Sequence, residues 1–455
     1  MKKRALLTSG PVARQIFGLA APMAFGMLAI MGFNLVDTWF VSQIGTVELA
    51  AMSLTFPVVA IIGSLGMGIG VGVTSVLSRA IGGGGADEVK RLTTDALLLA
   101  MGIVLVVSVG GWLSIDPLFG LLGADEETLP LVREYMQIWY LGTVFLVVAM
   151  VGLAAVRATG DTRTPAAVMM FAGLVNAIMD PILIFGLGPV PALGLAGAAT
   201  STVIARSTTL VVALLVLGLR ERIITSRFDG LGATLASWKR ILAIGGPAAA
   251  TNLAQPLTIG LLTGLVAGFG HEAVAAFGAG ARVEMLAMIP VLALGIGMTP
   301  FIGQNWGAGR KDRVGESLRI GARAAVGIGL VGWLVLAALA QPIAGLFSDD
   351  PQVVSGIALY LSILPAAHGM MGMFFVANNT FNAVGRPLSA TALTLLRAPL
   401  LMFGLGFLGA ELAGVPGIFV GMAVATSLAG IVAWFATRKL RGAQPEPTTS
   451  PMAAP

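Results

Sequence analysis

The sequence contains no cysteine, and only 11% of its 455 residues are charged. Without cysteine, the chain forms no disulfide, zinc–thiolate site or iron–sulfur cluster. Soluble domains carry about 25% charged residues, so this chain has too few for a surface that faces water. It also lacks the GxxxxGKS/T nucleotide loop and the HExxH and GxSxG motifs of hydrolases. These absences argue against a soluble enzyme, an ATP-driven pump and a bound cofactor.

Long apolar runs dominate what is present: 56% of the residues are hydrophobic, and the mean hydropathy is +0.92. A helix needs about 20 apolar residues to cross a bilayer. The sequence predicts twelve such spans, at residues 12–42, 47–81, 90–115, 129–156, 164–187, 193–219, 237–268, 273–306, 315–340, 353–383, 387–408 and 415–437. We therefore expect a multi-pass membrane protein in contact with lipid.

The charges alternate between the two sides of this arrangement. Basic residues gather before the first span and after every second one, as at Lys2, Lys3 and Arg4 and at Arg438 to Arg441. The opposite connections carry acids such as Asp116 and Asp125, with Arg133 as their lone base. Basic loops stay cytoplasmic, so both termini are predicted to be cytoplasmic in an inner membrane. The net charge of +5 does not indicate nucleic-acid binding, because the basic residues are dispersed.

The two halves of the chain superpose with one offset of 225 residues. This offset carries Pro22 onto Pro247 and the "GGGG" turn onto Gly307 and Gly309. Each copy holds six spans and returns to its starting side, so the copies are parallel repeats. We predict two pseudo-symmetric six-helix lobes, at 1–219 and 237–440, with a cytoplasmic linker at 220–236 and a disordered tail at 441–455.

Two acids lie inside spans: Asp37 in "FNLVDTWFV" and Asp180 in "NAIMDPILIFG". An Asp at a helix centre costs roughly 2.5–3.5 kcal/mol on insertion scales, so such residues are functional by default. Desolvation disfavours the charged form of a carboxylate, which suits a group that takes up a proton or a small cation. Both acids lie at a similar depth in the first lobe, and the second copy has none at the matching positions. The alternative is a carboxylate that serves packing alone.

Polar and proline neighbours accompany these acids. Asn34 and Asn176 precede Asp37 and Asp180 by three and four residues, so each pair shares a helix face. Proline removes a helical hydrogen bond and kinks the helix, which makes Pro22 and Pro181 candidate hinges.

In the second lobe, several polar residues are candidates to line a substrate cavity: Asn252, Gln255, His368 and Asn378. Interhelical packing is the alternative role for each of them. Arg282 and Glu284, in the eighth span, are expected to neutralise each other.

The sequence resembles the MATE (multidrug and toxic compound extrusion) transporters, and within them the subgroup named after the DNA-damage-inducible protein F. The resemblance covers Arg14 to Arg438. It is carried by "LAAPMAFGMLAIMGFNLVDTWFVSQIG", "VRATGDTRTPA", "NAIMDPILIFGLG", "GLAGAATSTVIAR" and "IGQNWGAGRKDRV".

The resemblance implies the MATE fold and antiport of organic, often cationic, drugs against H⁺ or Na⁺ by a protein that is not an enzyme. It assigns the coupling site to Asp37, Asn176, Asp180 and Thr202, with Thr200 as a rival for the last position, and by spacing to Tyr135. We expect a monomer. A flippase for lipids or oligosaccharides is the first alternative, and an intramembrane aspartyl enzyme is the second.

Overall fold

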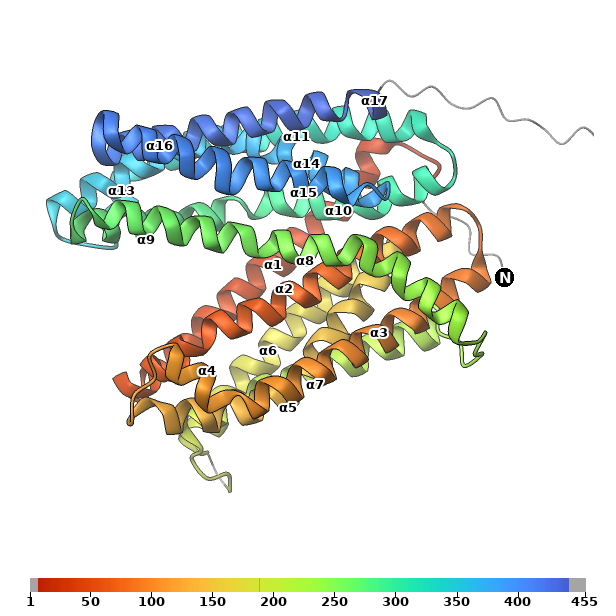
Figure 1. Cartoon of the computed structure of the whole chain (residues 1–455), viewed down its shortest axis with the longest axis horizontal. Coiled ribbons are helices and arrows are strands. Elements are labelled where there is room, and N and C mark those ends of the chain that lie inside the picture. Colours follow the sequence, from red (N-terminus) through yellow and green to blue (C-terminus); the bar gives the residue numbers. More distant parts are fainter. Residues whose placement is uncertain (1–6, 188, 442–455) are drawn as a thin grey trace, which may run out of the picture. The chain divides into compact units, whose positions relative to one another are not determined.

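The structure is a computed structural model that describes residues 7–187 and 189–441. Within this part of the chain every regular element is a helix and no strand occurs (Figure 1). The all-α fold expected from the sequence is confirmed. The basic residues Lys2, Lys3 and Arg4 fall outside the described residues, as does the predicted tail apart from Arg441.

The first half of the chain contains α1 (Val12–Ser42), α2 (Thr46–Gly82), α3 (Ala86–Leu113), α4 (Ile115–Leu121), α5 (Thr128–Ala158), α6 (Arg163–Phe185), α7 (Gly194–Leu215) and the π-helical turn η1 (Val216–Arg220). The second half contains α8 (Leu231–Ala267), α9 (His271–Ala287), α10 (Ile289–Gly307), α11 (Lys311–Ala338), α12 (Ala340–Ala344), α13 (Pro351–Ile363), η2 (Leu364–Ala367), α14 (His368–Ala383), α15 (Pro387–Leu395), η3 (Leu396–Met402), α16 (Phe403–Ala436) and α17 (Arg438–Arg441).

The described helices account for the twelve predicted spans. Ten helical runs are long and apolar enough to cross a membrane, and α9 with α10 forms an eleventh that bends by 45°. The run Pro387–Ala436 has 50 residues, which is about 75 Å of helix and far more than a 30 Å hydrocarbon core requires. Its backbone leaves the helical region at Ala413 and Gly414. This break divides the run into the last two spans.

Helix boundaries repeat along the chain at the offset seen in the sequence. Helix α2 ends at Gly82 and α10 at Gly307, 225 residues apart, and the short helices α4 and α12 begin at the same separation. Gly84 and Gly309 follow the first pair with φ of 79° and 73°. Glycine adopts this left-handed conformation without a Cβ clash, and it ends the helix in both copies. The repeat in sequence is therefore also a repeat in structure.

By internal contacts the chain forms two compact units. The N-terminal unit comprises Pro22–Leu77 and Asp87–Leu253, and the C-terminal unit comprises Met1–Ala21, Ser78–Ala86 and Ala254–Pro455. The chain passes from one unit to the other inside α1, α2 and α8 and at the first residue of α3. These units are defined by contacts, whereas the lobes expected at 1–219 and 237–440 are defined by the sequence repeat. The division into those lobes stays a prediction.

In the N-terminal unit, α7 packs against both α5 and α6 (Figure 1). Polar contacts join other helices of this unit. Ser108 of α3 contacts the hydroxyl of Thr143 of α5, and the indole of Trp238 in α8 donates to the carbonyl of Asp95 in α3 at 2.9 Å. Lipid is as apolar as a leucine side chain, so such contacts and close packing, rather than escape from water, hold spans together.

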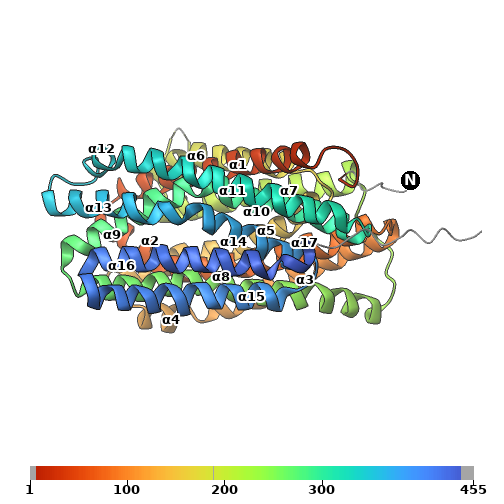
Figure 2. The ribbon, with the colours of Figure 1, turned by 90° about the horizontal axis from the view of Figure 1, so that it is seen from above.

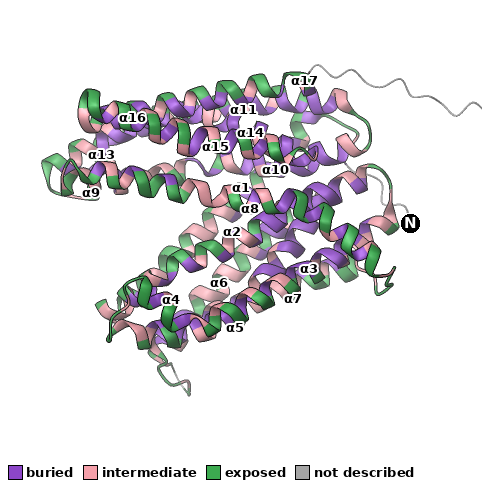
Figure 3. Cartoon of the chain, in the orientation of Figure 1, coloured by how far each residue is buried: buried purple, intermediate pink, exposed green. Residues whose placement is uncertain are grey.

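In the C-terminal unit, α14 packs against both α11 and α16 (Figure 2). Phe277, Tyr360 and Phe419 form an aromatic cluster with ring centroids 5.0–6.4 Å apart. Each such ring pair adds about 0.5–1.5 kcal/mol beyond the burial of its surface. Buried and exposed positions alternate around the helices of this unit, as expected where one face packs and the other meets lipid (Figure 3).

Candidate ion-coupling site

Asp180 of α6 is fully buried inside the N-terminal unit, at 0% exposure. Its Oδ1 accepts hydrogen bonds from the Asn176 amide at 3.2 Å and from the Ser201 hydroxyl of α7. The same Asn176 nitrogen lies 2.9 Å from the Ser201 oxygen. Asn176 precedes Asp180 by one helical turn, so the two side chains lie on one face of α6, as the sequence predicted. The packing of α6 against α7 supplies the hydroxyl.

Asp37 of α1 is half-buried and interacts electrostatically with Asp180, Tyr135 and Arg206 of the same unit. One oxygen of each carboxyl group, Oδ1 of Asp37 and Oδ2 of Asp180, is buried without a hydrogen-bond partner among the described residues. A buried polar atom that lacks a partner costs roughly 1–3 kcal/mol, more when it is charged. These two oxygens are therefore poised to accept a proton or contact a cation.

Arg206 is a member of this cluster that the sequence interpretation missed. Its guanidinium lies 4.9 Å from the ring centroid of Trp139, and its Nη1 is buried without a partner among the described residues. The signal was available, because an arginine inside the apolar run 193–219 is as costly in lipid as an aspartate. Tyr135 of α5, predicted by spacing, is buried and interacts with the same charged groups.

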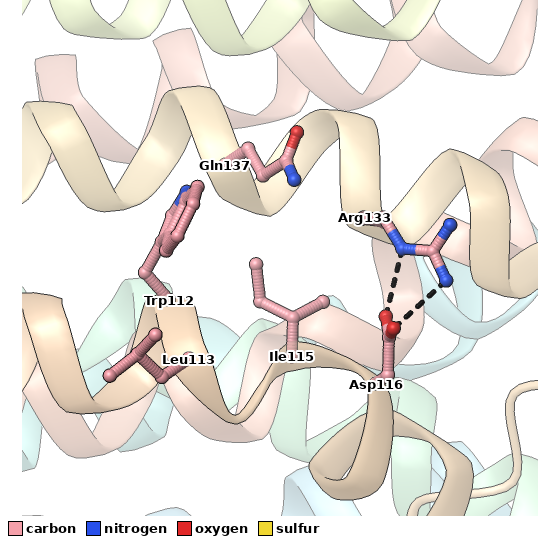
Figure 4. Close-up of a pocket in the computed structure, with 6 residues that line it drawn as sticks. All are labelled: Trp112, Leu113, Ile115, Asp116, Arg133 and Gln137. Atoms are coloured by element: carbon pink, nitrogen blue, oxygen red, sulfur yellow. Dashed lines mark hydrogen bonds and ion pairs between the residues drawn. The ribbon is translucent and has the colours of Figure 1, made fainter.

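The acids outside the spans show what a fully satisfied carboxylate looks like in this protein. Asp116 accepts two hydrogen bonds from Arg133, at 2.8 and 2.9 Å, beside a pocket of about 190 Å³ (Figure 4). Asp125 accepts from the amide and the hydroxyl of Thr128, at 2.8 and 2.7 Å, and these bonds lower its pKa. Asp37 and Asp180, by contrast, each keep one carboxyl oxygen without a hydrogen-bond partner among the described residues.

The hydroxyl that contacts Asp180 belongs to neither of the two threonines that the sequence favoured. Thr202 donates to the carbonyl of Ala198 at 3.0 Å, and Thr200 donates to that of Ala196 at 2.8 Å. Ser201, between them, reaches Asp180. With 3.6 residues per turn, three successive residues point in different directions, and spacing alone does not select among them. Asn34 is exposed, although it lies one turn from Asp37.

Both predicted hinges lie inside helices. Pro22 is in α1, at the point where the chain leaves the C-terminal unit and enters the N-terminal one. Pro181 is in α6, directly after Asp180. Whether either helix bends there during transport stays a prediction.

The C-terminal unit holds a second buried polar cluster around Glu284 of α9. Its Oε2 accepts from the Tyr360 hydroxyl, and its Oε1 lies 3.3 Å from Nε2 of His368. Glu284 thus engages Tyr360 and His368 rather than Arg282, its expected partner. Residues two apart on a helix do not face each other, which explains the difference.

Arg397 of η3 belongs to the same cluster and is 2% exposed. It donates to the side-chain oxygen of Gln255, and its guanidinium lies 5.0 Å from the ring centroid of Phe374. Its Nε has no partner among the described residues, and neither has the buried side-chain oxygen of Asn378. Of the four predicted cavity residues, Gln255, His368 and Asn378 belong to this unit, whereas Asn252 belongs to the N-terminal one.

Two parallel six-span repeats, with buried carboxylates in one of them, are typical of a membrane transporter. The family model MatE matches the chain twice, at residues 22–182 and 247–408, and these segments begin at the offset found above. The chain belongs to the MATE family, and it is a transporter rather than an enzyme.

Relatives named for what they transport align with nearly the whole chain. It is 40% identical to the FAD transporter of Shewanella oneidensis over 97% of both chains. It is 24% identical to the multidrug export protein MepA of Staphylococcus aureus over 95% of this chain and 94% of that one. The Vibrio cholerae MATE transporter VcmN in the bent form superposes with a TM-score of 0.90 at 31% identity, covering 94% and 97% of the two chains.

Proposed function

We propose that the protein is an ion-coupled exporter that binds its coupling ion at Asp37 and Asp180. The observation that carries this proposal is the pair of buried carboxyl oxygens that lack partners. With both carboxyl groups ionised, the cluster with Arg206 has one excess negative charge, which one monovalent cation neutralises. Interacting carboxylates of this kind favour the uptake of a shared proton.

The surroundings of the pair favour H⁺ over Na⁺ as that ion. Sodium requires several oxygen ligands, whereas Asn176 turns its amide nitrogen toward Asp180 and Ser201. The Arg206 guanidinium adds a positive charge that repels a metal cation but tolerates a proton covalently held on oxygen.

Neutralisation of the acids also has a mechanical consequence in this proposal. Pro22 leaves the carbonyl of Gly18 without its helical donor, so α1 bends at low cost. Proton uptake by Asp37 would shift α1 between straight and bent forms and thereby alternate the access of substrate to the two sides of the membrane.

For the exported compound we propose an anionic molecule with planar rings, of which FAD is the example. The relative at 40% identity is named a FAD transporter, and FAD combines a diphosphate with two ring systems. Arg397, in the C-terminal unit, has a guanidinium that lies over an aromatic ring and keeps a buried nitrogen without a partner among the described residues. Guanidinium donors of this kind match phosphate oxygens.

Export of organic cations, as expected from the family resemblance, is the second candidate. The Asp37–Asp180 pair favours it electrostatically, and relatives named multidrug export proteins support it. The two candidates differ in how the proton acts. A cation competes directly with the proton for the acids, whereas an anion is released only through the conformational change.

The test is exchange in liposomes that contain the purified protein. FAD or ethidium is loaded on one side, and a pH gradient or a Na⁺ gradient is imposed separately. We expect the pH gradient to drive FAD export, Asp37→Asn to abolish it, and Asp87→Asn to leave it unchanged, because Asp87 is fully exposed outside the site.

Undiminished export by the Asp37→Asn protein would overturn the coupling site. Movement of ethidium but not FAD would select the second candidate, and a response to Na⁺ alone would show that Na⁺ rather than H⁺ is the coupling ion.

A Pro22→Ala variant tests the hinge: we expect it to bind substrate normally and to transport more slowly.

A further inference from the structure

A cationic pocket lies on the C-terminal unit and shares no lining residue with either buried cluster. It has a volume of about 420 Å³ and is formed by α11, α14, α16 and α17. Figure 2 shows α17 at the end of α16, near the start of α11. The side chains that line it are Arg319, Ala322, Arg323, Val326, Met373, Trp434 and Arg441.

Among the described residues that line this pocket, positive charge is not balanced by an acid. Three of the lining residues are arginines and none is a carboxylate. Burial, and then repulsion by Arg319 and Arg438, lowers the pKa of Arg441. Positive charges that are held close together repel one another, and a bound anion would offset this repulsion.

Two of the three arginines, Arg319 and Arg441, donate to backbone carbonyls. The Arg441 guanidinium lies 3.5 Å from the ring centroid of Trp434 and donates to the Trp434 carbonyl at 2.9 Å. Arg319 donates to the carbonyl of Arg441 at 3.4 Å. Nε of Arg441 is buried without a partner among the described residues. The pocket thus keeps a donor ready for an anionic oxygen, and Arg319 and Arg323 are exposed beside it.

The pocket continues into an apolar surface along α11. Val326 lines it and is 37% exposed, and Leu330, one turn further on, is 50% exposed. The ligand implied by this arrangement has an anionic head and an apolar tail. A free phosphate ion supplies the anionic group but has no apolar tail.

We propose that this pocket binds the phosphate headgroup of an anionic glycerophospholipid such as phosphatidylglycerol, with an acyl chain along Val326 and Leu330. The pocket lies at the end of the unit where α16 leads into Arg438 to Arg441, which the charge pattern predicts to be cytoplasmic. Basic pockets between spans on that side are suited to lipid headgroups. The bound phosphate bridges α11 and α17 and stabilises the C-terminal unit.

The experiment measures thermal unfolding of the full chain in detergent after removal of native lipid. The additions are phosphatidylglycerol, phosphatidylcholine, glycerol 3-phosphate and inorganic phosphate. A double variant, Arg319→Gln with Arg323→Gln, empties the pocket of two exposed charges. The matched control, Arg227→Gln with Lys239→Gln, removes the same net charge from exposed positions in the N-terminal unit.

We expect phosphatidylglycerol, but not phosphatidylcholine, to raise the unfolding temperature of the wild-type and control proteins, and the pocket variant to lose this rise. Equal stabilisation of the pocket variant and the control would overturn the site. Equal stabilisation by glycerol 3-phosphate or inorganic phosphate would overturn the lipid assignment in favour of a free-anion site. Because the readout is stability, its failure leaves the proposed transport function untouched.

Discussion

At the scale of single residues, the site depends on a hydroxyl in a run of three. Residues 200–202 read Thr-Ser-Thr, and a sequence interpretation offers no means to choose among them. In the structure all three hydroxyls lie within hydrogen-bond distance of a carbonyl of their own helix, and of the three only that of Ser201 also contacts the buried Asp180. The choice follows from the rotation of α7 against α6, which is a property of packing. Asp37 and Asp180, by contrast, could be singled out from the sequence, because an acid in lipid stands out on cost alone.

Replacement of Ser201 by alanine tests this assignment. We expect Ser201→Ala to destabilise the protein by about 1.5–3 kcal/mol, the usual worth of a hydrogen bond to a charged group, and to impair pH-driven export. Thr202→Ala is the control, and it should change both readouts little, since its hydroxyl bonds only within α7. Unfolding temperature and liposome exchange are the measurements. Equal losses in the two variants would reject the special role of Ser201.

At the scale of elements, the span boundaries expected from apolar runs agree with the helices to within a few residues at most ends, and α1 agrees at both. Apolar length and charged connections determine these limits because a helix in lipid must satisfy its own backbone. The interior irregularities were harder to anticipate. The 45° bend between α9 and α10 and the π-helical turn η3 carry no pattern in the apolar runs.

The break between the last two spans depends on one glycine. Gly414 has φ 60° and ψ −141°, a conformation that other residues adopt at a cost of about 1–3 kcal/mol. We expect Gly414→Ala to lower the free energy of unfolding by about 1–3 kcal/mol, which is measured as a lower unfolding temperature. Gly404→Ala is the matched control within the same helix, where an added Cβ meets open space, and it should be neutral or stabilising. A neutral Gly414→Ala variant would show that the break is not conformationally demanding.

At the scale of the whole molecule, the repeat is the organising feature. Its offset is visible in the residues, in the helix ends and in the two segments that match the MatE model. The buried polar side chains, however, are not repeated. The N-terminal unit carries the acids Asp37 and Asp180, and the C-terminal unit carries Arg397 near Glu284 and His368. The two copies share a scaffold and differ in a few buried polar side chains.

The orientation of the whole chain is open to a direct test, because the natural sequence has no cysteine. Single cysteines at Asp87 and Glu126 occupy exposed positions on connections predicted to lie on opposite sides. In intact cells we expect a membrane-impermeant thiol reagent to label Glu126→Cys and not Asp87→Cys. After permeabilisation it should label both. Labelling of Asp87→Cys in intact cells would invert the predicted topology.

The sequence by itself determined the membrane class, the number of spans, the repeat and the two costly acids. Each of these follows from local composition or from the price of placing charge in lipid. Only the tertiary structure decided which groups meet those two acids and Glu284. Ser201, Arg206 and the contact of Glu284 with His368 arise where separate helices pack, and the direction of a side chain there depends on helix rotation that no spacing encodes.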